Sequence, residues 1–127
     1  MKSRFIWIVV ILIIFAAVFW FTTKEGGVGE DNIEIARNWV MKEASTYVYD
    51  GNNIVFKSEE IVIFEDREAH SYTFTFESRH GGYGDRTDKI VIQVITPHEI
   101  KVITQDEKVI SAVTDGVFDE LNKKILE

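Results

Sequence analysis

The sequence lacks cysteine altogether and holds a single proline among its 127 residues. Without cysteine, neither a disulfide framework nor a thiolate metal site can form. Disorder is excluded, because 13% of the residues are aromatic and strings of Ile and Val supply apolar surface. The formal charge of −7 argues against nucleic acid as a partner, since a nucleic-acid binder carries a basic patch.

Acidic residues are absent from the first 23 positions, and residues 5–21 (FIWIVVILIIFAAVFWF) hold no charged side chain. As a helix, this run extends about 26 Å at ~1.5 Å per residue, close to the roughly 30 Å of a hydrocarbon core. Trp7 and Trp20 lie near its ends, where indole rings favour the membrane interface. The alternative is a cleaved signal peptide, whose apolar region usually spans ~7–15 residues and ends in small residues. This run ends in VFWF, so we expect an uncleaved transmembrane anchor.

The charges on either side of this run predict its orientation. Lys2 and Arg4 precede it, whereas the chain beyond position 23 carries 12 basic and 21 acidic side chains, a charge of −9. By the positive-inside rule, the N-terminus is cytoplasmic and the acidic domain lies outside the cell membrane. The expected parts of this single-pass protein are an N-terminal transmembrane anchor (residues 1–23), a Gly-rich linker (residues 24–30) and an extracytoplasmic α+β domain (residues 31–127).

A helix is expected at the start of this domain. Residues 31–34 (DNIE) form a capping box, because an N-cap acceptor is followed three residues later by Glu. Apolar residues then recur at helical spacing, and such a face packs on a core more often than on a partner. These residues are Ile33, Ala36, Val40 and Ala44.

Strands are expected beyond the turn cluster at residues 50–53, where β-branched and aromatic residues dominate. Residues 72–77 alternate between apolar and polar, which is typical of a half-buried strand. Residues 89–96 (KIVIQVIT) are apolar on both faces apart from Gln93, which is typical of a central strand. Further strands are predicted at residues 54–64, 99–104 and 109–113, with a hairpin turn at residues 105–108.

A closing helix is expected from about Asp115, with Phe118, Leu121 and Ile125 on one side. The order of elements predicts an α+β fold. In this fold the transmembrane helix is followed by a helix packed on a four- to five-stranded antiparallel sheet, and a C-terminal helix ends the chain.

The most informative segment is residues 78–87 (SRHGGYGDRT), which joins two predicted strands but is unlike a minimal hairpin turn. Its three glycines leave backbone amides open, and arginine binds carboxylate or phosphate bidentately. The segment can therefore be a binding surface for a protein or a small anionic partner. Charged turn residues are usually only solvated, however, so the interpretation we favour is an elaborate turn in which Asp85 pairs with Arg79 or Arg86. The candidate binding residues are Arg79, His80, Tyr83, Asp85, Arg86 and His98.

Metal and catalytic chemistry have weaker support. His80 and His98 flank opposite ends of the strand predicted at residues 89–96, and His70 begins an earlier strand, so we expect neither a metal site nor a cofactor. Ser78, His80 and Asp85 are triad residue types, but they lie on one turn, so no catalytic residue is predicted. No Walker motif follows the glycines. The main hypothesis is a binding module that is not obviously catalytic. The alternative is a small extracytoplasmic hydrolase with His80 or His98 as general base.

The string SRHGGYGDRT, followed by QVITPH and KVISAVTDG, resembles an uncharacterised family of small membrane-anchored archaeal and bacterial proteins. Members share the pattern SRHxGYGDR…VITPH, which covers most of residues 33–118 here, and the resemblance implies no established activity. Some members carry a Cys pair ahead of the strand at residues 72–78; this chain has none, so no role of such a pair carries over. The helix followed by a meander also looks like PepSY and cystatin-like architectures, which implies an extracytoplasmic interaction or protease-inhibitor module.

The orientation can be tested by proteolysis of intact cells. Because Lys2 and Arg4 retain the N-terminus inside, added protease is expected to digest the domain beyond residue 23 and to spare a tag on Met1. Immunoblots against the tag and the domain measure both outcomes. Loss of the tag with survival of the domain would reverse the orientation.

Overall fold

The computed structural model describes residues 28–127, and residues Asn32–Glu127 form one compact unit. The predicted anchor, residues 1–23, lies outside the described residues. Between residue 28 and the C-terminal residue, no helix is long and apolar enough to cross a membrane.

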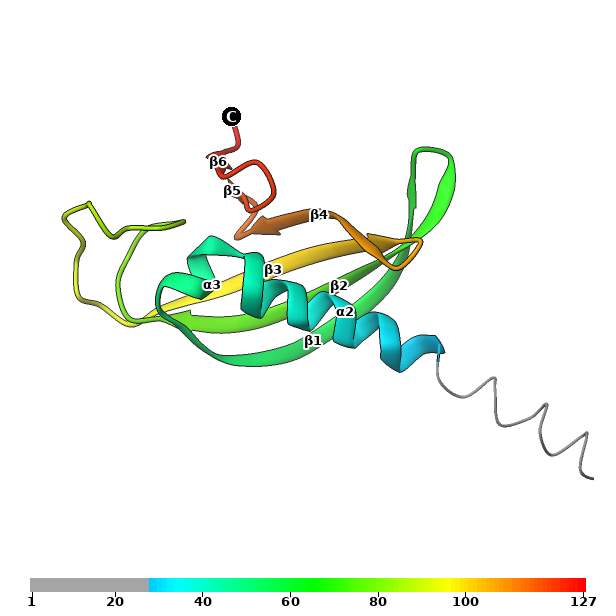
Figure 1. The fold of residues 1–127 in the computed structure, drawn as a ribbon, viewed down its shortest axis with the longest axis horizontal. Coiled ribbons are helices and arrows are strands. Elements are labelled where there is room, and N and C mark those ends of the chain that lie inside the picture. The colour runs from blue at the N-terminus through cyan, green and yellow to red at the C-terminus, as the bar shows by residue number, and fades with distance from the viewer. Residues whose placement is uncertain (1–27) are drawn as a thin grey trace, which may run out of the picture. The chain divides into compact units, whose positions relative to one another are not determined.

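Two helices precede an antiparallel sheet in which each strand pairs with the next along the chain (Figure 1). The helices are α2 (Val28–Glu43) and α3 (Ser45–Asp50). The strands are β1 (Gly51–Phe64), β2 (Arg67–Ser78), β3 (Thr96–Gln105), β4 (Lys108–Thr114), β5 (Phe118–Asp119) and β6 (Lys124–Ile125). The predicted α+β class is confirmed, but the sheet has six strands rather than four or five.

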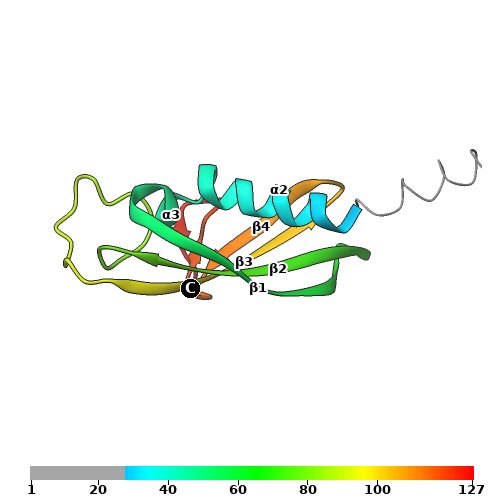
Figure 2. The ribbon, with the colours of Figure 1, turned by 90° about the horizontal axis from the view of Figure 1, so that it is seen from below.

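Helix α2 packs its apolar stripe against the sheet. Ala36, Val40 and Ala44 have no exposed surface, and both helices lie on the same face of the sheet (Figure 2). The core that they cover contains Tyr72, Phe74 and Phe76 from β2 and Ile100 and Val102 from β3. The predicted stripe is therefore part of the core. The helix begins at Val28, so the capping box predicted at residues 31–34 does not mark its first turn.

Two tight turns set the register of the long strands. Glu65 and Asp66 link β1 to β2, Asp106 and Glu107 link β3 to β4, and all four have φ between 49° and 62°. Positive φ at both central residues is typical of the type I′ turn, whose twist suits antiparallel strands. The hairpin turn predicted at residues 105–108 is confirmed.

The strand predicted at residues 89–96 is wrong. Residues 89–95 lie in a long connection, and β3 begins only at Thr96 and pairs directly with β2. Helices cover a single face of the sheet, so a strand that alternates between buried and exposed residues fits beside β2. β3 has this alternation, with Ile100 and Val102 buried and Lys101 exposed, whereas residues 89–96 are apolar on both faces.

The C-terminal helix predicted from about Asp115 is also wrong. Asp115 and Gly116 have φ of 55° and 67°, and the chain reverses there, so Phe118 pairs with the last residue of β4. Phe118 is buried, but Leu121 and Ile125 are 39% and 53% exposed, and the predicted helical stripe is not a buried face. The short strands β5 and β6 take the place of the helix.

A fragment of residues 28–127 is expected to fold without the preceding residues. All members of its core cluster lie between Ala36 and Ala112, so the apolar interior is complete within the fragment. Thermal unfolding followed by circular dichroism should show a single sigmoidal transition from a mixed helix and strand spectrum. A broad, non-cooperative melt would mean that the core needs residues 1–27.

Candidate functional site

The candidate residues lie on and around the long loop, residues 79–95, which connects β2 to β3. Ser78 and Thr96 pair across these two strands, so the loop leaves the sheet and returns to it at the same position. In Figure 1 it extends from the end of the sheet that lies beside α3. A loop of this size needs polar contacts of its own to be ordered, because its backbone takes no part in the hydrogen bonds of the sheet.

The carboxylate of Asp50, the last residue of α3, supplies several of these contacts. One oxygen accepts hydrogen bonds from the backbone amides of Arg79 and His80, at 3.0 and 2.9 Å. The same oxygen lies 2.9 Å from Nδ1 of His80. The other oxygen accepts a hydrogen bond of 2.5 Å from Nη2 of Arg86. Four donors from the loop thus converge on one side chain that is 8% exposed.

Arg86 is the largest fully buried side chain of the described part, at 2% exposure. Its Nη1 donates a hydrogen bond of 2.7 Å to the carbonyl of Gly82, which has a φ of 95°. The guanidinium also lies over the ring of Tyr49, 4.6 Å from the centroid. Within residues 32–127, its Nε is buried without a hydrogen-bond partner. These contacts make Arg86 a structural cation of the loop.

A second carboxylate, that of Asp115 after β4, holds the base of the loop. Its Oδ2 lies 2.6 Å from Nδ1 of His98 and accepts a hydrogen bond of 3.1 Å from the hydroxyl of Tyr83. Burial raises the pKa of the Tyr83 phenol, and the negative charge of Asp115 and its hydrogen bond add to the increase. The Tyr83 ring stacks on Phe118 with centroids 5.8 Å apart. Tyr83 therefore joins the loop to the C-terminal segment as a neutral phenol.

The contacts of His98 have the connectivity of a catalytic triad. Its Nε2 lies 3.0 Å from Oγ of Ser78, on the far side of the ring from Asp115. However, Ser78 has no exposed surface, and its hydroxyl lies 2.8 Å from the His80 carbonyl, to which it can donate. A substrate must be able to reach the nucleophile, and the buried Ser78 hydroxyl is not accessible to one. The chain of contacts ties β2, β3 and the loop together.

The two histidines of the hydrolase hypothesis are closer than the sequence predicted, but they do not share a cavity with Asp85. Residues 89–95 form no strand between them, and Ser78 contacts both the His80 carbonyl and the His98 ring. His80 faces Asp50 and His98 faces Asp115. Within residues 32–127, no group of three or more His, Asp or Glu side chains could hold a metal ion.

Asp85 and Arg79 are the exposed members of the candidate set. Asp85 accepts hydrogen bonds from the side-chain hydroxyl and the backbone amide of Thr87, and both lower the pKa of the carboxyl. The ion pair predicted between Asp85 and Arg79 or Arg86 is absent from the described residues, because Arg86 pairs with Asp50 instead. The interpretation of the segment as an elaborate turn is thus supported, but its ion pair joins Arg86 to Asp50 and not to Asp85.

A third carboxylate was missed by the sequence analysis. Glu120 has no exposed surface and accepts hydrogen bonds from the hydroxyls of Ser45 and Thr114, at 3.0 and 2.9 Å. Next to it, the hydroxyl of Thr46 accepts a hydrogen bond of 2.9 Å from the amide of Gly84. The C-terminal segment, α3 and the long loop are therefore connected through buried polar groups.

A cavity of about 520 Å³ lies between the long loop and the C-terminal segment, and we call it the cationic pocket. Its size is within the roughly 300–1,000 Å³ that is usual for ligand pockets. Four basic side chains and no acidic side chain line it. The lining residues are Gly81, Gly82, Tyr83, Arg86, Lys89, Ile90, Val91, Ile92, Phe118, Lys123, Lys124 and Ile125.

The basic side chains of the cationic pocket differ in their partners. Arg86 is paired with Asp50, and Lys123 donates a hydrogen bond of 2.6 Å to the carbonyl of Glu43. Lys89 and Lys124 are exposed and take part in no ion pair among residues 32–127. Two ammonium groups that form no short ion pair within this range thus flank the pocket. Their influence on acidic groups is electrostatic: in addition to hydrogen bonds, Lys89 helps to lower the pKa of Asp85, and Lys124 helps to lower the pKa of Asp119.

The cavity that His98 lines, of about 480 Å³, has the opposite character. Its acidic side chains are Glu77, Glu99 and Asp115, and His98 is its only basic group. Of the six candidate residues, Tyr83 and Arg86 line the cationic pocket, His98 lines this acidic cavity, and Arg79, His80 and Asp85 line neither. The six do not form one surface.

The residues of the loop contacts and of the cationic pocket that the sequence analysis missed are Asp50, Asp115, Glu120, Lys89, Lys123 and Lys124. A local signal was present for two of them. Asp50 and Asp115 each stand directly before a glycine, and an Asp-Gly pair is a strong turn signal. An aspartate at such a turn can accept hydrogen bonds from backbone amides of a neighbouring segment, as both do here.

The role of Asp50 predicts a large loss of stability on substitution. Asp50→Ala leaves the buried Arg86 guanidinium without its counter-charge, which costs about 3–5 kcal/mol when one partner of a buried pair is removed. Asp85→Ala is the matched control, because it removes an exposed carboxylate from the long loop that Asp50 holds. Urea unfolding of the 28–127 fragment measures both. Equal midpoints for the two variants would contradict the structural role of Asp50.

Comparison with known proteins adds no functional assignment: no protein-family model, no curated protein and no solved structure matches this chain. The resemblance to the family with the SRHxGYGDR…VITPH pattern therefore stays a prediction from the sequence.

Proposed function

We propose that the chain is a membrane-anchored extracytoplasmic binding module whose ligand is an anion held in the cationic pocket. The observation that carries the proposal is the charge of the lining. Residues 28–127 hold 20 acidic and 11 basic side chains, yet four of the basic ones and none of the acidic ones line this cavity. The side chains that an anion meets in this lining are basic or uncharged, which favours anionic ligands.

The frame of the pocket supports binding without rearrangement. Arg86 and Tyr83 are held by Asp50 and Asp115, and Tyr83 stacks on Phe118. Side chains that are already ordered lose little conformational entropy when a ligand arrives. The loop that was considered as a binding surface for a protein or a small anion thus forms part of the pocket. Of its candidate binding residues, Tyr83 and Arg86 line the pocket.

The location of the module is proposed from the sequence. The apolar run at residues 5–21 and the preceding Lys2 and Arg4 favour an anchor with the domain outside the cell. The helix ahead of an antiparallel meander is similar to PepSY and cystatin-like architectures, which favours an interaction role over catalysis. This likeness rests on the order of elements alone.

The general-base alternative has less support. The hydroxyl that contacts His98 belongs to the buried Ser78. The ring of His80 contacts the carboxylate of Asp50, whereas the ring of His98 contacts that of Asp115. An enzyme would need an accessible nucleophile or a water site beside one of these rings. A binding module needs only the pocket.

Inorganic phosphate is the probe for the proposed function. In ¹H–¹⁵N spectra of the 28–127 fragment, phosphate is expected to shift the amide signals of the residues that line the cationic pocket, which are residues 81–83, 86, 89–92, 118 and 123–125 in the loop and the C-terminal segment. The double variant Lys89→Ala/Lys124→Ala should weaken the affinity about tenfold or more, because hydrogen bonds to charged groups are lost. Added salt should weaken binding as well, since it screens exposed charges.

The matched control is Lys101→Ala/Lys108→Ala, which removes the same charge from two exposed lysines outside the pocket. A small loss of affinity in the control is expected from the change in net charge alone. If both double variants lose affinity equally, or if neither phosphate nor an alkyl carboxylate shifts a pocket amide, the proposed function is wrong.

A further inference from the structure

The cationic pocket is bordered by apolar side chains that the fold leaves in water. Residues 32–127 expose fourteen large hydrophobic side chains, and eight of them belong to the long loop or to the segment after β4. Ile90 is fully exposed, and Ile92 and Ile125 are 76% and 53% exposed. All three line the pocket. Exposed apolar groups concentrated at one place indicate a surface that is covered when the protein is at work.

Basic and apolar groups are arranged side by side on both walls of the pocket. On the loop wall, Lys89 is followed directly by the aliphatic residues 90–92. On the opposite wall, Lys124 is followed by Ile125. Phe118 also lines the pocket and is stacked on Tyr83. Each wall thus offers one site for a negative charge and, next to it, a site for hydrocarbon.

A small polar anion would use only half of this lining. It would neutralise Lys89 and Lys124 but would leave the exposed aliphatic residues Ile90, Ile92 and Ile125 in water. A ligand that also carries a hydrocarbon chain removes this apolar surface from water, which is favourable in proportion to the area covered. The lining therefore fits a ligand with a charged head and an apolar tail better than a free inorganic ion.

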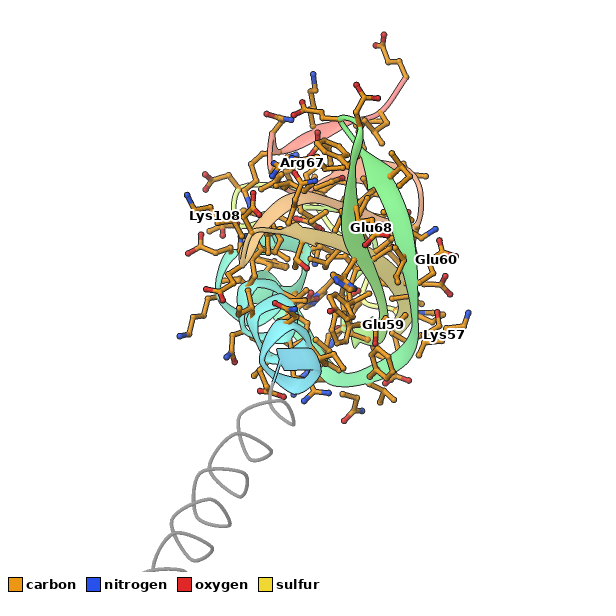
Figure 3. The ribbon with its side chains drawn as sticks, turned by 90° about the vertical axis from the view of Figure 1, so that its right-hand side faces the viewer. Lys57, Glu59, Glu60, Arg67, Glu68 and Lys108 are labelled. Carbon is orange, nitrogen blue, oxygen red and sulfur yellow. The ribbon has the colours of Figure 1, made fainter. Side chains whose placement is uncertain are left out.

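The acidic cavity and the far end of the sheet lack this combination. The cavity beside His98 carries three carboxylates, which repel an anion. Figure 3 shows the end of the sheet opposite the long loop, where Lys57, Arg67 and Lys108 are interspersed with glutamates. These glutamates are Glu59, Glu60 and Glu68. A single-sign patch beside exposed aliphatic groups is a property of the cationic pocket.

We infer that the ligand of the cationic pocket is a single-chain anionic amphiphile. Its carboxylate or phosphate head lies between Lys89 and Lys124, and its aliphatic chain lies along Ile90, Ile92 and Phe118. This inference rests on the proposed function, because it names the ligand class of the same pocket. The chemistry is shared by a free fatty acid or alkyl phosphate and by the lipids of a bilayer, and the experiment separates these sources.

A chain-length series tests the inference. The 28–127 fragment, whose core is complete, is titrated calorimetrically with phosphate, acetate, hexanoate, octanoate and decanoate, all below the concentration at which they form micelles. Affinity is expected to rise by at least about tenfold from hexanoate to decanoate, since a fully buried methylene contributes roughly fourfold. Octanol, which has the chain without the charge, should bind much more weakly than octanoate. The decanoate titration is repeated with the full-length chain in phosphatidylcholine nanodiscs against empty nanodiscs.

Two double variants locate the chain-binding wall. Ile90→Ser/Ile92→Ser removes two exposed aliphatic side chains of the pocket and should abolish the rise of affinity with chain length. Ile61→Ser/Ile63→Ser is the matched control, because these isoleucines of β1 are 63% and 70% exposed and lie outside the pocket. The control should keep the chain-length dependence of the unmodified fragment.

The outcomes separate this inference from the proposed function. If phosphate binds but affinity does not rise with chain length, the inference is overturned and the proposed function stands. If neither phosphate nor any alkyl carboxylate binds, both are overturned. Flotation with phosphatidylglycerol vesicles in the absence of decanoate binding would overturn the inference, because a bilayer surface would then be the partner. A dimer that persists with decanoate in light-scattering measurements would also overturn it, since a second copy would cover the apolar groups.

Discussion

The carboxylate of Asp50 neutralises the buried cation around which the long loop is folded. Arg86 is 2% exposed, and a charge removed from water in this way is tolerated only when it is paired and hydrogen-bonded. The remaining lone pairs of Asp50 accept hydrogen bonds from the amides of Arg79 and His80, so one side chain satisfies both the guanidinium and the start of the loop. The shape of the cationic pocket depends on this pair, because Arg86 lines it.

Asp115 and Glu120 extend the same principle to the other end of the loop. The carboxylate of Asp115 accepts a hydrogen bond from Tyr83 and contacts the ring of His98. The carboxylate of Glu120 accepts hydrogen bonds from hydroxyls of α3 and β4. The interior therefore carries carboxylates, and the basic side chains that they do not pair with remain on the surface. Lys89 and Lys124 are two of these, and they flank the pocket. The engagement of Asp50, Asp115 and Glu120 by the loop and its neighbours is one reason why an acidic domain contains a cationic pocket.

The parts of the fold that were predicted correctly have a local pattern that matches their surroundings. The helical spacing of Ala36 and Val40 predicted the buried face of α2, and alternation at residues 72–77 predicted β2. Two predicted elements were wrong, the strand at residues 89–96 and the helix from Asp115. Both segments have an apolar pattern, but the described part of the fold offers no buried surface that fits it. Residues 89–96 read as a strand, but the sheet has one face covered by helices and β3 already lies beside β2. The helical spacing after Asp115 was overridden by positive φ at Asp115 and Gly116.

The sequence by itself determined the α+β class and the hairpin at residues 105–108, and it drew attention to residues 78–87, because periodicity and turn residues act over a few positions of the chain. Only the tertiary structure decided what those loop residues do. His80 and Arg86 are bound by Asp50, which lies about thirty residues earlier, and the pocket is completed by Lys123 and Lys124 from the far end of the chain. Ion pairing and burial depend on distance in space, and no local pattern records that distance.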